Sequence, residues 1–330
     1  MRRRQFLSRV CMAACAAGLL TTPLMAQSAT TFKAADVHPK GYPNVVAVEN
    51  LGKKLEKATD GRLKIQMFPG GVLGDEKTMI EQTQIGAIHL YRVSVGGLSV
   101  VVPDVNAFSL PYIFRDQDHM RKVIDGPVGQ EMLDKITNNP ASRVVGLAWM
   151  DSGTRNVYAK KAIKTPADLK GLKIRMQGNP LFVDTMNAMG GNAISMPFGE
   201  LYTALQTGVV DGAENNEPSY YSQNHYTVAN FFSRTGHLII PEILVFSKVA
   251  WDKLEKADQD LIKKLAREAQ MEQRELWNKT VADDIAKLKE KGVTIVEDVD
   301  VKAFIDATAP IREKYGAPYA EMVKKVQAVQ

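Results

Sequence analysis

Short apolar runs alternate with amphipathic stretches along the chain after residue 30. Residues 31–37 and 63–68 have the length and composition of strands, and residues 45–58 between them have helical spacing. The same order recurs later, where the strand-like residues 172–176 precede the helix-like residues 180–189. Strands that alternate with helices favour an α/β fold, in which helices cover the faces of a sheet.

Further strands are expected at residues 87–93, 105–110, 144–150, 156–159, 209–213, 238–247 and 293–296. A long amphipathic segment then covers residues 258–291, where Leu265, Met271 and Leu288 belong to one apolar stripe. Apolar residues do not recur at both core positions of a heptad in this segment. We therefore expect a long helix that wraps the surface of the protein.

The first 26 residues have the composition of an export signal. Positive charges at residues 2–4 precede an apolar run over residues 10–20, and Ala26 is a candidate cleavage site. The run is shorter than the roughly 20 residues of a membrane span, which favours cleavage over a retained anchor. Residues 3–7 (RRQFL) resemble a twin-arginine signal, and ordinary Sec export stays open as the alternative.

Loss of this leader changes the composition of the chain. It removes four of 42 basic residues and none of 37 acidic ones, so the formal charge falls from +5 to 38 − 37 = +1. This charge gives no reason to expect nucleic acid as a partner. Cys11 and Cys15 also leave, which excludes disulfides from the mature protein, although lipidation of Cys15 is a minor alternative. The remaining length suits two domains.

Common catalytic and cofactor motifs are missing from the sequence. The five histidines do not fall at metal-ligand spacing, and there is no Gly-x-Ser-x-Gly sequence. The glycine clusters at 70–74 and 190–191 match neither a dinucleotide-binding fingerprint nor a P-loop. We therefore expect a binding protein with no catalytic residues, no metal and no cofactor, and we keep an exported enzyme as the alternative.

Polar residues follow three of the expected strands. Arg175 ends the strand at 172–176, residues 214–216 follow the strand at 209–213, and residues 151–155 follow the strand at 144–150. Sheets of α/β proteins place ligands beyond the carboxyl ends of their strands. A guanidinium there suits a carboxylate, because its planar fork donates two parallel hydrogen bonds. Arg175 is thus a candidate anchor, although taken alone it could be a solvated strand end.

Two segments, 169–175 (LKGLKIR) and 196–215 (MPFGELYTALQTGVVDGAEN), resemble the solute receptors of tripartite ATP-independent periplasmic (TRAP) transporters. These are the receptors of the C4-dicarboxylate and sialic-acid type. Residues 68–76 (FPGGVLGDE) and 108–112 (FSLPY) fit the same family, and the resemblance covers essentially the whole mature chain. The long match at 204–215 is very specific, and it favours Arg175 as the carboxylate anchor.

The resemblance implies a two-lobed periplasmic binding protein of the α/β class. The arrangement is type II-like, of the Venus-flytrap kind, with crossing strands between the lobes and a long helix that spans both. We expect lobe I at residues 27–152 plus 241–280 and lobe II at residues 153–240 plus 281–330. The ligand would bridge the two lobes and favour the closed form.

The resemblance also assigns site residues. Arg175 matches the signature arginine of the family, Asn215 its ligand-contacting asparagine, and Arg155 a second arginine that some members use on the same ligand. Asn179 lies close to Arg175 in the sequence, although before Pro180 it could instead be a helix N-cap.

Lobe I would supply three further contacts, at Glu76, Arg92 and His38. Each has a simpler alternative. Glu76 could stabilise the start of a helix, Arg92 could pair with an acid, and His38 could be a turn residue before Pro39.

Several hydrogen-bonding residues beside one anchor suit a polyhydroxy acid. A carboxylate such as Glu76 accepts hydrogen bonds from hydroxyls but repels a second acid group. The sequence is most similar to the hexuronate-binding branch of the family, through residues 36–39 (DVHP), 92–94 (RVS) and 177–180 (QGNP). We expect D-glucuronate or D-galacturonate, with other sugar acids, sialic acid and C4-dicarboxylates as alternatives.

The family resemblance implies a periplasmic protein that delivers its ligand to integral membrane subunits encoded elsewhere. A receptor for an ATP-driven importer, a chemoreceptor, and an exported enzyme acting on a sugar acid are the competing interpretations.

Overall fold

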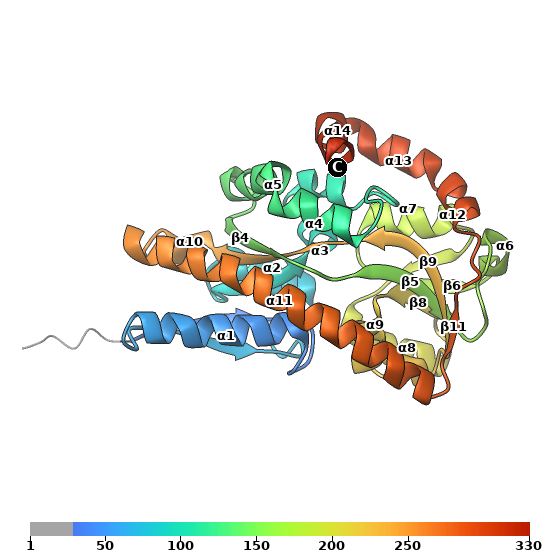
Figure 1. Cartoon of the computed structure of the whole chain (residues 1–330), viewed down its shortest axis with the longest axis horizontal. Helices are drawn as coiled ribbons and strands as arrows, with labels where there is room; N and C mark the ends of the chain where they lie inside the picture. The colour runs from blue at the N-terminus through green and yellow to red at the C-terminus, as the bar shows by residue number, and fades with distance from the viewer. Residues whose placement is uncertain (1–28) are drawn as a thin grey trace, which may run out of the picture.

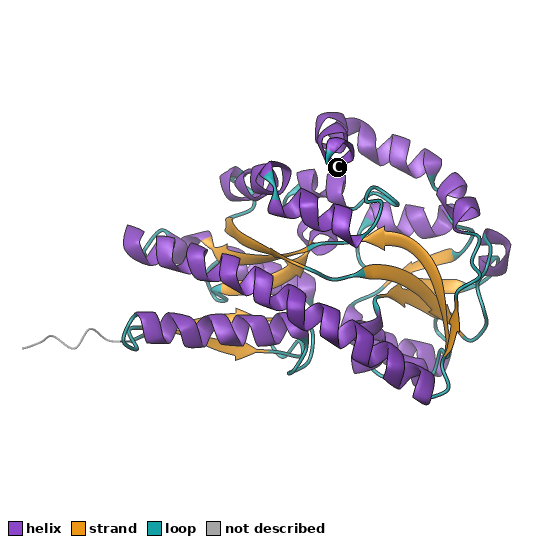
Figure 2. Cartoon of the chain, viewed as in Figure 1, coloured by secondary structure: helices purple, strands orange, loops and turns teal. Residues whose placement is uncertain are grey.

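The computed structural model describes residues 29–330, so the expected leader, its cleavage site, Cys11 and Cys15 lie outside the described residues. Two mixed β-sheets form the centre of this part of the chain, and helices pack around them (Figure 1, Figure 2). The expected α/β class is therefore confirmed. Within residues 29–330 we find no helix with the length and apolar character that crossing a membrane would require.

The first sheet consists, in spatial order, of β2 (Leu63–Phe68), β1 (Thr30–Ala35), β3 (Leu90–Ser94), β10 (Glu242–Ser247) and β4 (Val144–Met150). Strand β1 is parallel to β2 and β3, whereas β10 is antiparallel to both β3 and β4. The helices of this half are α1 (Pro43–Ala58), α2 (Glu76–Gln84), α3 (Val95–Leu98), the 3₁₀ helix η1 (Pro103–Phe108), α4 (Gln117–Asp125), α5 (Pro127–Asn138) and α10 (Lys248–Trp251).

The second sheet consists, in spatial order, of β11 (Thr294–Val296), β9 (Phe231–Ile239), β5 (Thr154–Ala159), β8 (Gly212–Asn215), β6 (Lys173–Met176) and β7 (Asn192–Ser195). Strand β6 is parallel to β7 and β8, and β5 is antiparallel to β8 and β9. The helices that follow these strands are α6 (Pro166–Leu169), α7 (Pro180–Ala188), η2 (Phe198–Glu200), α8 (Leu201–Thr207), α9 (Glu217–Ser222), η3 (His225–Thr227), α12 (Val301–Ala307), α13 (Ala309–Gly316), η4 (Ala317–Tyr319) and α14 (Ala320–Ala328).

The chain crosses between the two sheets through neighbouring strands. Strand β4 leads into β5 through residues 151–153, and β9 leads into β10 through residues 240–241. Met150 pairs with Glu242 in the first sheet, and Thr154 pairs with Ile239 in the second, so the two connections run side by side (Figure 1). Each sheet is therefore built from segments that lie far apart in the sequence.

Helix α11 (Lys256–Glu290) is the expected long helix, and it runs across both halves (Figure 1). It packs against α1 and β4 of the first half and against α9 of the second. The expected apolar stripe is correct at Leu265 and Leu288 but wrong at Met271, which is 52% exposed. Gln273 of the same helix is buried, and its side-chain oxygen accepts a hydrogen bond from the Asp151 backbone N–H at 2.8 Å. Polar contacts thus attach this helix to the crossing strands.

Three expected strands differ from the structure. Residues 238–247 were expected to form one strand, but the segment is divided between β9 and β10 at Pro241, which has no backbone N–H to donate. Residues 105–110 fall mostly within η1, a 3₁₀ helix that begins at Pro103. Strand β8 begins at Gly212 rather than at Val209, which is 52% exposed.

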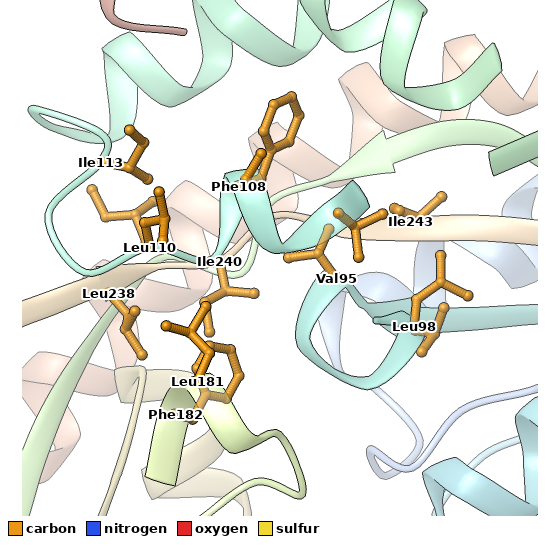
Figure 3. Packing of buried hydrophobic residues seen from close by; sticks show 14 of the residues in the cluster. Val95, Leu98, Phe108, Leu110, Ile113, Leu181, Phe182, Leu238, Ile240 and Ile243 are labelled. Atoms are coloured by element: carbon orange, nitrogen blue, oxygen red, sulfur yellow. The ribbon is translucent and has the colours of Figure 1, made fainter. Parts of the chain in front are cut away.

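A large apolar cluster joins the two halves beside the crossing strands. Leu181 and Phe182 of α7 pack in the same cluster as Leu238 of β9 and Ile240 of the second connection (Figure 3). The fit against α3 is close, because a Cβ atom added at Gly96 would lie 2.3 Å from the Phe182 ring. This apolar cluster therefore packs the two halves of the protein against each other.

Candidate ligand-binding cleft

Two adjoining cavities lie between the sheets. The larger has a volume of about 530 Å³, within the range typical of ligand pockets. The smaller, of about 30 Å³, is strongly polar. Both are lined by Val37, Glu76, Arg175, Gln177 and Phe198. The smaller cavity is lined in addition by His38, Arg92, Ser94, Ser152, Arg155, Asn215 and Glu242. Six of the seven expected site residues thus reach one place.

Arg175 lies on the wall of both cavities with an uncompensated charge. It is on β6 and only 2% exposed. Its Nε donates a hydrogen bond to the Met196 carbonyl at 2.9 Å, and neither terminal nitrogen has a hydrogen-bond or ion-pair partner within residues 29–330. Burial lowers the pKa of this guanidinium. A buried fork with two free donors is suited to a carboxylate that enters the cleft.

Arg155, in contrast, is neutralised by the protein. Its Nε and Nη2 donate to the Glu214 carboxylate at 2.5 and 2.7 Å. Burial alone would raise the pKa of Glu214, but Arg155 and His237 lower it to about 2. The Nη1 of Arg155 donates to the Asn215 side-chain oxygen at 3.0 Å, and this bond fixes the orientation of the Asn215 amide. Its Nδ2 group has no protein acceptor among residues 29–330 and remains available as a donor.

Arg92 is also compensated, and by two acids. Its Nε donates to Asp36 at 2.8 Å, its Nη1 donates to Glu242 at 2.7 Å, and its Nη2 contacts Asp36 and His38. Burial would raise the pKa of Asp36, but Arg92 and His38 lower it to about 2. All three guanidinium nitrogens are therefore occupied. The pairing with an acid that was the simpler expectation for Arg92 is present, and the side chain still lines the smaller cavity.

His38 connects this network to the second half. Burial, and then the charge of Arg92, lower its pKa to about 4, so the ring is neutral near pH 7. The Nδ1 atom lies against Arg92, and Nε2 is 3.2 Å from the Ser219 hydroxyl. The imidazole is stacked on the ring of Tyr42 with the centroids 3.9 Å apart. Its position in the cavity wall is thus fixed on several sides.

Glu76 faces the cleft from the start of α2. Asp75, and not Glu76, is the N-cap of this helix, because its side chain accepts from the Thr78 N–H at 2.8 Å. Glu76 instead accepts a hydrogen bond from the Gln177 amide, which also donates to Ser94 at 2.8 Å. Gln177 therefore links the two halves across the cavity.

Asn179 has a different place from the one we expected. It lines neither cavity, and its side-chain oxygen caps α7 by accepting from the Leu181 N–H at 2.8 Å. Its amide group donates to the Gly96 carbonyl, Ser99 and Asn106 at 3.0–3.2 Å. The helix N-cap alternative accounts for this residue, whose polar atoms are already paired within the protein.

Sequence reasoning missed Glu242 and assigned no contact to Ser94 and Ser152 within the segments 92–94 and 151–155, although all three line the smaller cavity. Phe198 also lines both cavities, and the centre of its ring lies 5.8 Å from the Arg175 guanidinium carbon. One signal was available for Glu242, because it is a single charged residue within the apolar run 238–247. Among residues 29–330 there is no group of three or more His, Cys, Asp or Glu side chains arranged to hold a metal.

Comparison with known proteins gives consistent matches. The model of the family "Bacterial extracellular solute-binding protein, family 7" matches residues 34–317. A TRAP periplasmic solute-binding protein from Pseudomonas putida F1, solved with bound D-glucuronate, is 57% identical, with a TM-score of 0.89 over 91% of this chain and 98% of that one. A protein from Bradyrhizobium, in complex with D-galacturonate, is 43% identical, with a TM-score of 0.87 over 90% and 99% of the two chains.

A third protein, from Citrobacter koseri, has been solved in two states. Its D-glucuronate complex is 51% identical, with a TM-score of 0.89 over 91% of this chain and all of that one. Its open form without ligand superposes less well, with 48% identity and a TM-score of 0.81 over 91% and 99% of the two chains. The present structure therefore superposes better on the liganded form of that protein than on its open form. The chain belongs to family 7 of the bacterial extracellular solute-binding proteins and has the two-sheet fold of the TRAP periplasmic receptors.

Proposed function

We propose that this protein is the receptor of a TRAP transporter and binds a hexuronate, D-glucuronate or D-galacturonate, with Arg175 as the carboxylate anchor. The observation that carries the proposal is the free guanidinium fork of Arg175, buried in the cleft wall between the two sheets. A buried charge without a partner is costly to the protein. That cost is offset when an anionic ligand supplies the partner.

The rest of the cavity favours a sugar acid over a dicarboxylate. Arg92 and Arg155 also line the smaller cavity, but carboxylates of the protein already neutralise them. Among the residues of the smaller cavity that the structure describes, a second acid group on the ligand would find no cation without a carboxylate partner besides Arg175, and it would meet Glu76 and Glu242. Hydroxyl groups suit these surroundings, because they can donate to the carboxylates and accept from the amide of Asn215.

The division into lobes supports this mode of binding. We propose lobe I at residues 27–152 plus 241–280 and lobe II at residues 153–240 plus 281–330. Two of the proposed boundaries between the lobes then fall in the connections at residues 151–153 and 240–241. Contacts to Glu76, Arg92 and His38 would come from lobe I, and contacts to Arg175, Arg155 and Asn215 from lobe II. A ligand that satisfies both sets stabilises the closed form.

Delivery and location follow from the family. We propose that residues 1–26 direct export to the periplasm and are then removed, by the twin-arginine or the Sec route. The receptor would then pass its ligand to the integral membrane subunits of the transporter. It would act as a carrier without catalysis, and accumulation of a product from the bound sugar acid would favour the enzyme alternative.

A thermal-shift screen of the purified mature protein tests the proposal. The acids to compare are D-glucuronate, D-galacturonate, succinate and sialic acid, with D-glucose as the neutral control. A ligand at a hundred times its Kd should stabilise the protein by about 2.7 kcal/mol. We expect a shift with the hexuronates and none with glucose. A shift with glucose alone, or with succinate but neither hexuronate, would contradict the proposed ligand.

A further inference from the structure

Glu242 stands out among the residues of the cleft because it is a buried carboxylate on a crossing strand. It is the first residue of β10, is 4% exposed and lines the smaller cavity. Its Oε2 accepts hydrogen bonds from Arg92 Nη1 at 2.7 Å and from Asn44 Nδ2 at 2.9 Å. The Ser152 side chain also lowers the pKa of this carboxyl, as the weakest of its neighbours' effects. With Oε2 used twice, Oε1 is the oxygen that can carry a proton.

The charges around the smaller cavity sum to a negative value before a ligand arrives. Apart from the histidines, the ionisable side chains in the wall of the smaller cavity and their ion-pair partners are Arg92, Arg155, Arg175, Asp36, Glu76, Glu214 and Glu242. Three positive and four negative charges give 3 − 4 = −1 before the ligand arrives. A bound carboxylate would bring the sum to −2. In a buried site with low effective dielectric, like charges raise each other's proton affinity.

Glu242 is the carboxyl of this set whose pKa lies near neutral pH. Burial, opposed by Arg92 and reinforced by Asp36 and Glu76, raises the pKa of Glu242 to about 7. Asp36 and Glu214 have pKa values of about 2, so they stay ionised near neutrality. The charged or titratable groups that face Glu242 are Arg92 and Tyr91 of β3, Asp36 after β1, Tyr42 before α1, Glu76 of α2 and Arg155 of β5.

We propose that Glu242 takes up a proton from solvent when the acid binds and that its Oε1–H then donates a hydrogen bond to a ligand oxygen. The inference rests on the proposed function, since it needs an anionic ligand at Arg175. Proton uptake returns the sum of charges from −2 to −1. The hydrogen bonds that Arg92 and Asn44 donate to Oε2 stay in place, so the cavity wall keeps its geometry.

Calorimetric titration with D-glucuronate or D-galacturonate in buffers of different ionisation enthalpy measures this uptake. At pH 8 the wild-type protein should take up close to one proton per ligand bound. Because protons are bound together with ligand, the affinity should fall by up to about tenfold between pH 6 and pH 8. Binding without proton uptake would overturn the inference and leave the proposed function intact. No binding of either hexuronate at any pH would overturn the proposed function, and the inference with it.

Glu242→Gln identifies the residue that takes up the proton. Its amide keeps an acceptor for Arg92 and Asn44 and presents a permanent donor to the ligand, so uptake should fall to near zero and affinity should become flat from pH 6 to pH 8. The matched control is Glu217→Gln, because Glu217 is 5% exposed and burial also raises its pKa, yet it lines neither cavity. This control should keep the wild-type uptake. Uptake that persists in Glu242→Gln assigns the proton elsewhere.

An infrared measurement on the wild-type protein covers the case in which Glu242→Gln does not fold. Addition of ligand at pH 8 should produce a protonated carboxylic-acid band in the difference spectrum. The absence of such a band, with ligand bound, would contradict the inference without any substitution.

Discussion

Two sides of the same cleft treat buried arginine in opposite ways. On the first sheet, Arg92 is enclosed by Asp36 and Glu242 and has all of its nitrogens occupied. On the second sheet, Arg175 is equally buried but keeps two terminal nitrogens without a partner in residues 29–330. A compensated charge stabilises the fold around it, whereas an uncompensated one weakens the fold until a ligand binds. An arginine with carboxylate partners thus belongs to the structure of the cavity wall, whereas the arginine without a partner is the one proposed to bind the ligand carboxylate.

Removal of the compensated arginine should have the largest effect, and the effect should be on folding. Arg92→Ala leaves Asp36 and Glu242 buried without their cation, which typically costs about 3–5 kcal/mol. Chemical denaturation of the ligand-free protein measures this loss. If the free energy of unfolding changes by less than about 1 kcal/mol, the comparison between the two sides fails.

Removal of the uncompensated arginine should act on binding instead. Arg175→Ala should weaken hexuronate binding by about 2–5 kcal/mol, because a desolvated carboxylate loses its partner. Arg175→Lys should recover little of this, since an ammonium cannot donate the parallel pair. Calorimetry gives the affinity, and denaturation should show that the ligand-free variants are as stable as the wild type or more so. Near-native affinity in either variant would remove Arg175 from its proposed role.

Acid should reveal the carboxylates that compensate the arginines. Asp36 and Glu214 have pKa values of about 2 in the folded protein, below the usual values for these side chains. Their contribution is fully present above about pH 5 and is lost as the pH falls toward 2, at about 2–3 kcal/mol for each. Unfolding free energies measured from pH 6 to pH 2 should show this slope. Asp36→Asn should have a shallower slope, and an unchanged slope would contradict the assignment.

The smallest effect is expected from a substitution in the apolar contact between the two halves, where Gly96 packs against Phe182. Gly96→Ala would place a methyl group against the Phe182 ring across the cleft, so the closed form should be disfavoured by about 1–3 kcal/mol and the affinity reduced about tenfold or more. Gly316→Ala is the control, because it lines neither cavity and its added Cβ meets only side-chain atoms of Leu110 and Val323, at 3.3 and 3.9 Å. Equal affinities of the two variants would show that this contact does not limit closure.

Local patterns in the sequence predicted some of these features well. The strands at 63–68 and 144–150 have the expected bounds, and Arg175 lies in the expected strand of the second sheet. These results depend on short-range apolar patterning. The polar ends of the expected strands also included Asn215 and Arg155, and the family resemblance added the positions of His38, Glu76 and Arg92, which line the same cavity.

The pairing of charges could not be predicted in the same way. Arg155 meets Glu214 because β5 and β8 are antiparallel in a register that places Asn156 opposite Asn215, and this register is a property of the assembled sheet. The place of Asn179 outside the cavities has a related cause, since its amide donates to acceptors in residues 96–106, which belong to the other half of the protein. Contacts between segments distant in sequence decide which polar groups remain free.

The crossing of the chain between the sheets also affects how the protein folds. Strand β10 lies between β3 and β4 in the first sheet, yet it is made only after the strands of the second sheet from β5 to β9. The N-terminal half therefore cannot complete its sheet during early synthesis and must wait for residues 242–247. Such late, long-range pairing slows folding. The first sheet of a nascent chain therefore stays incomplete until residues 242–247 have been made.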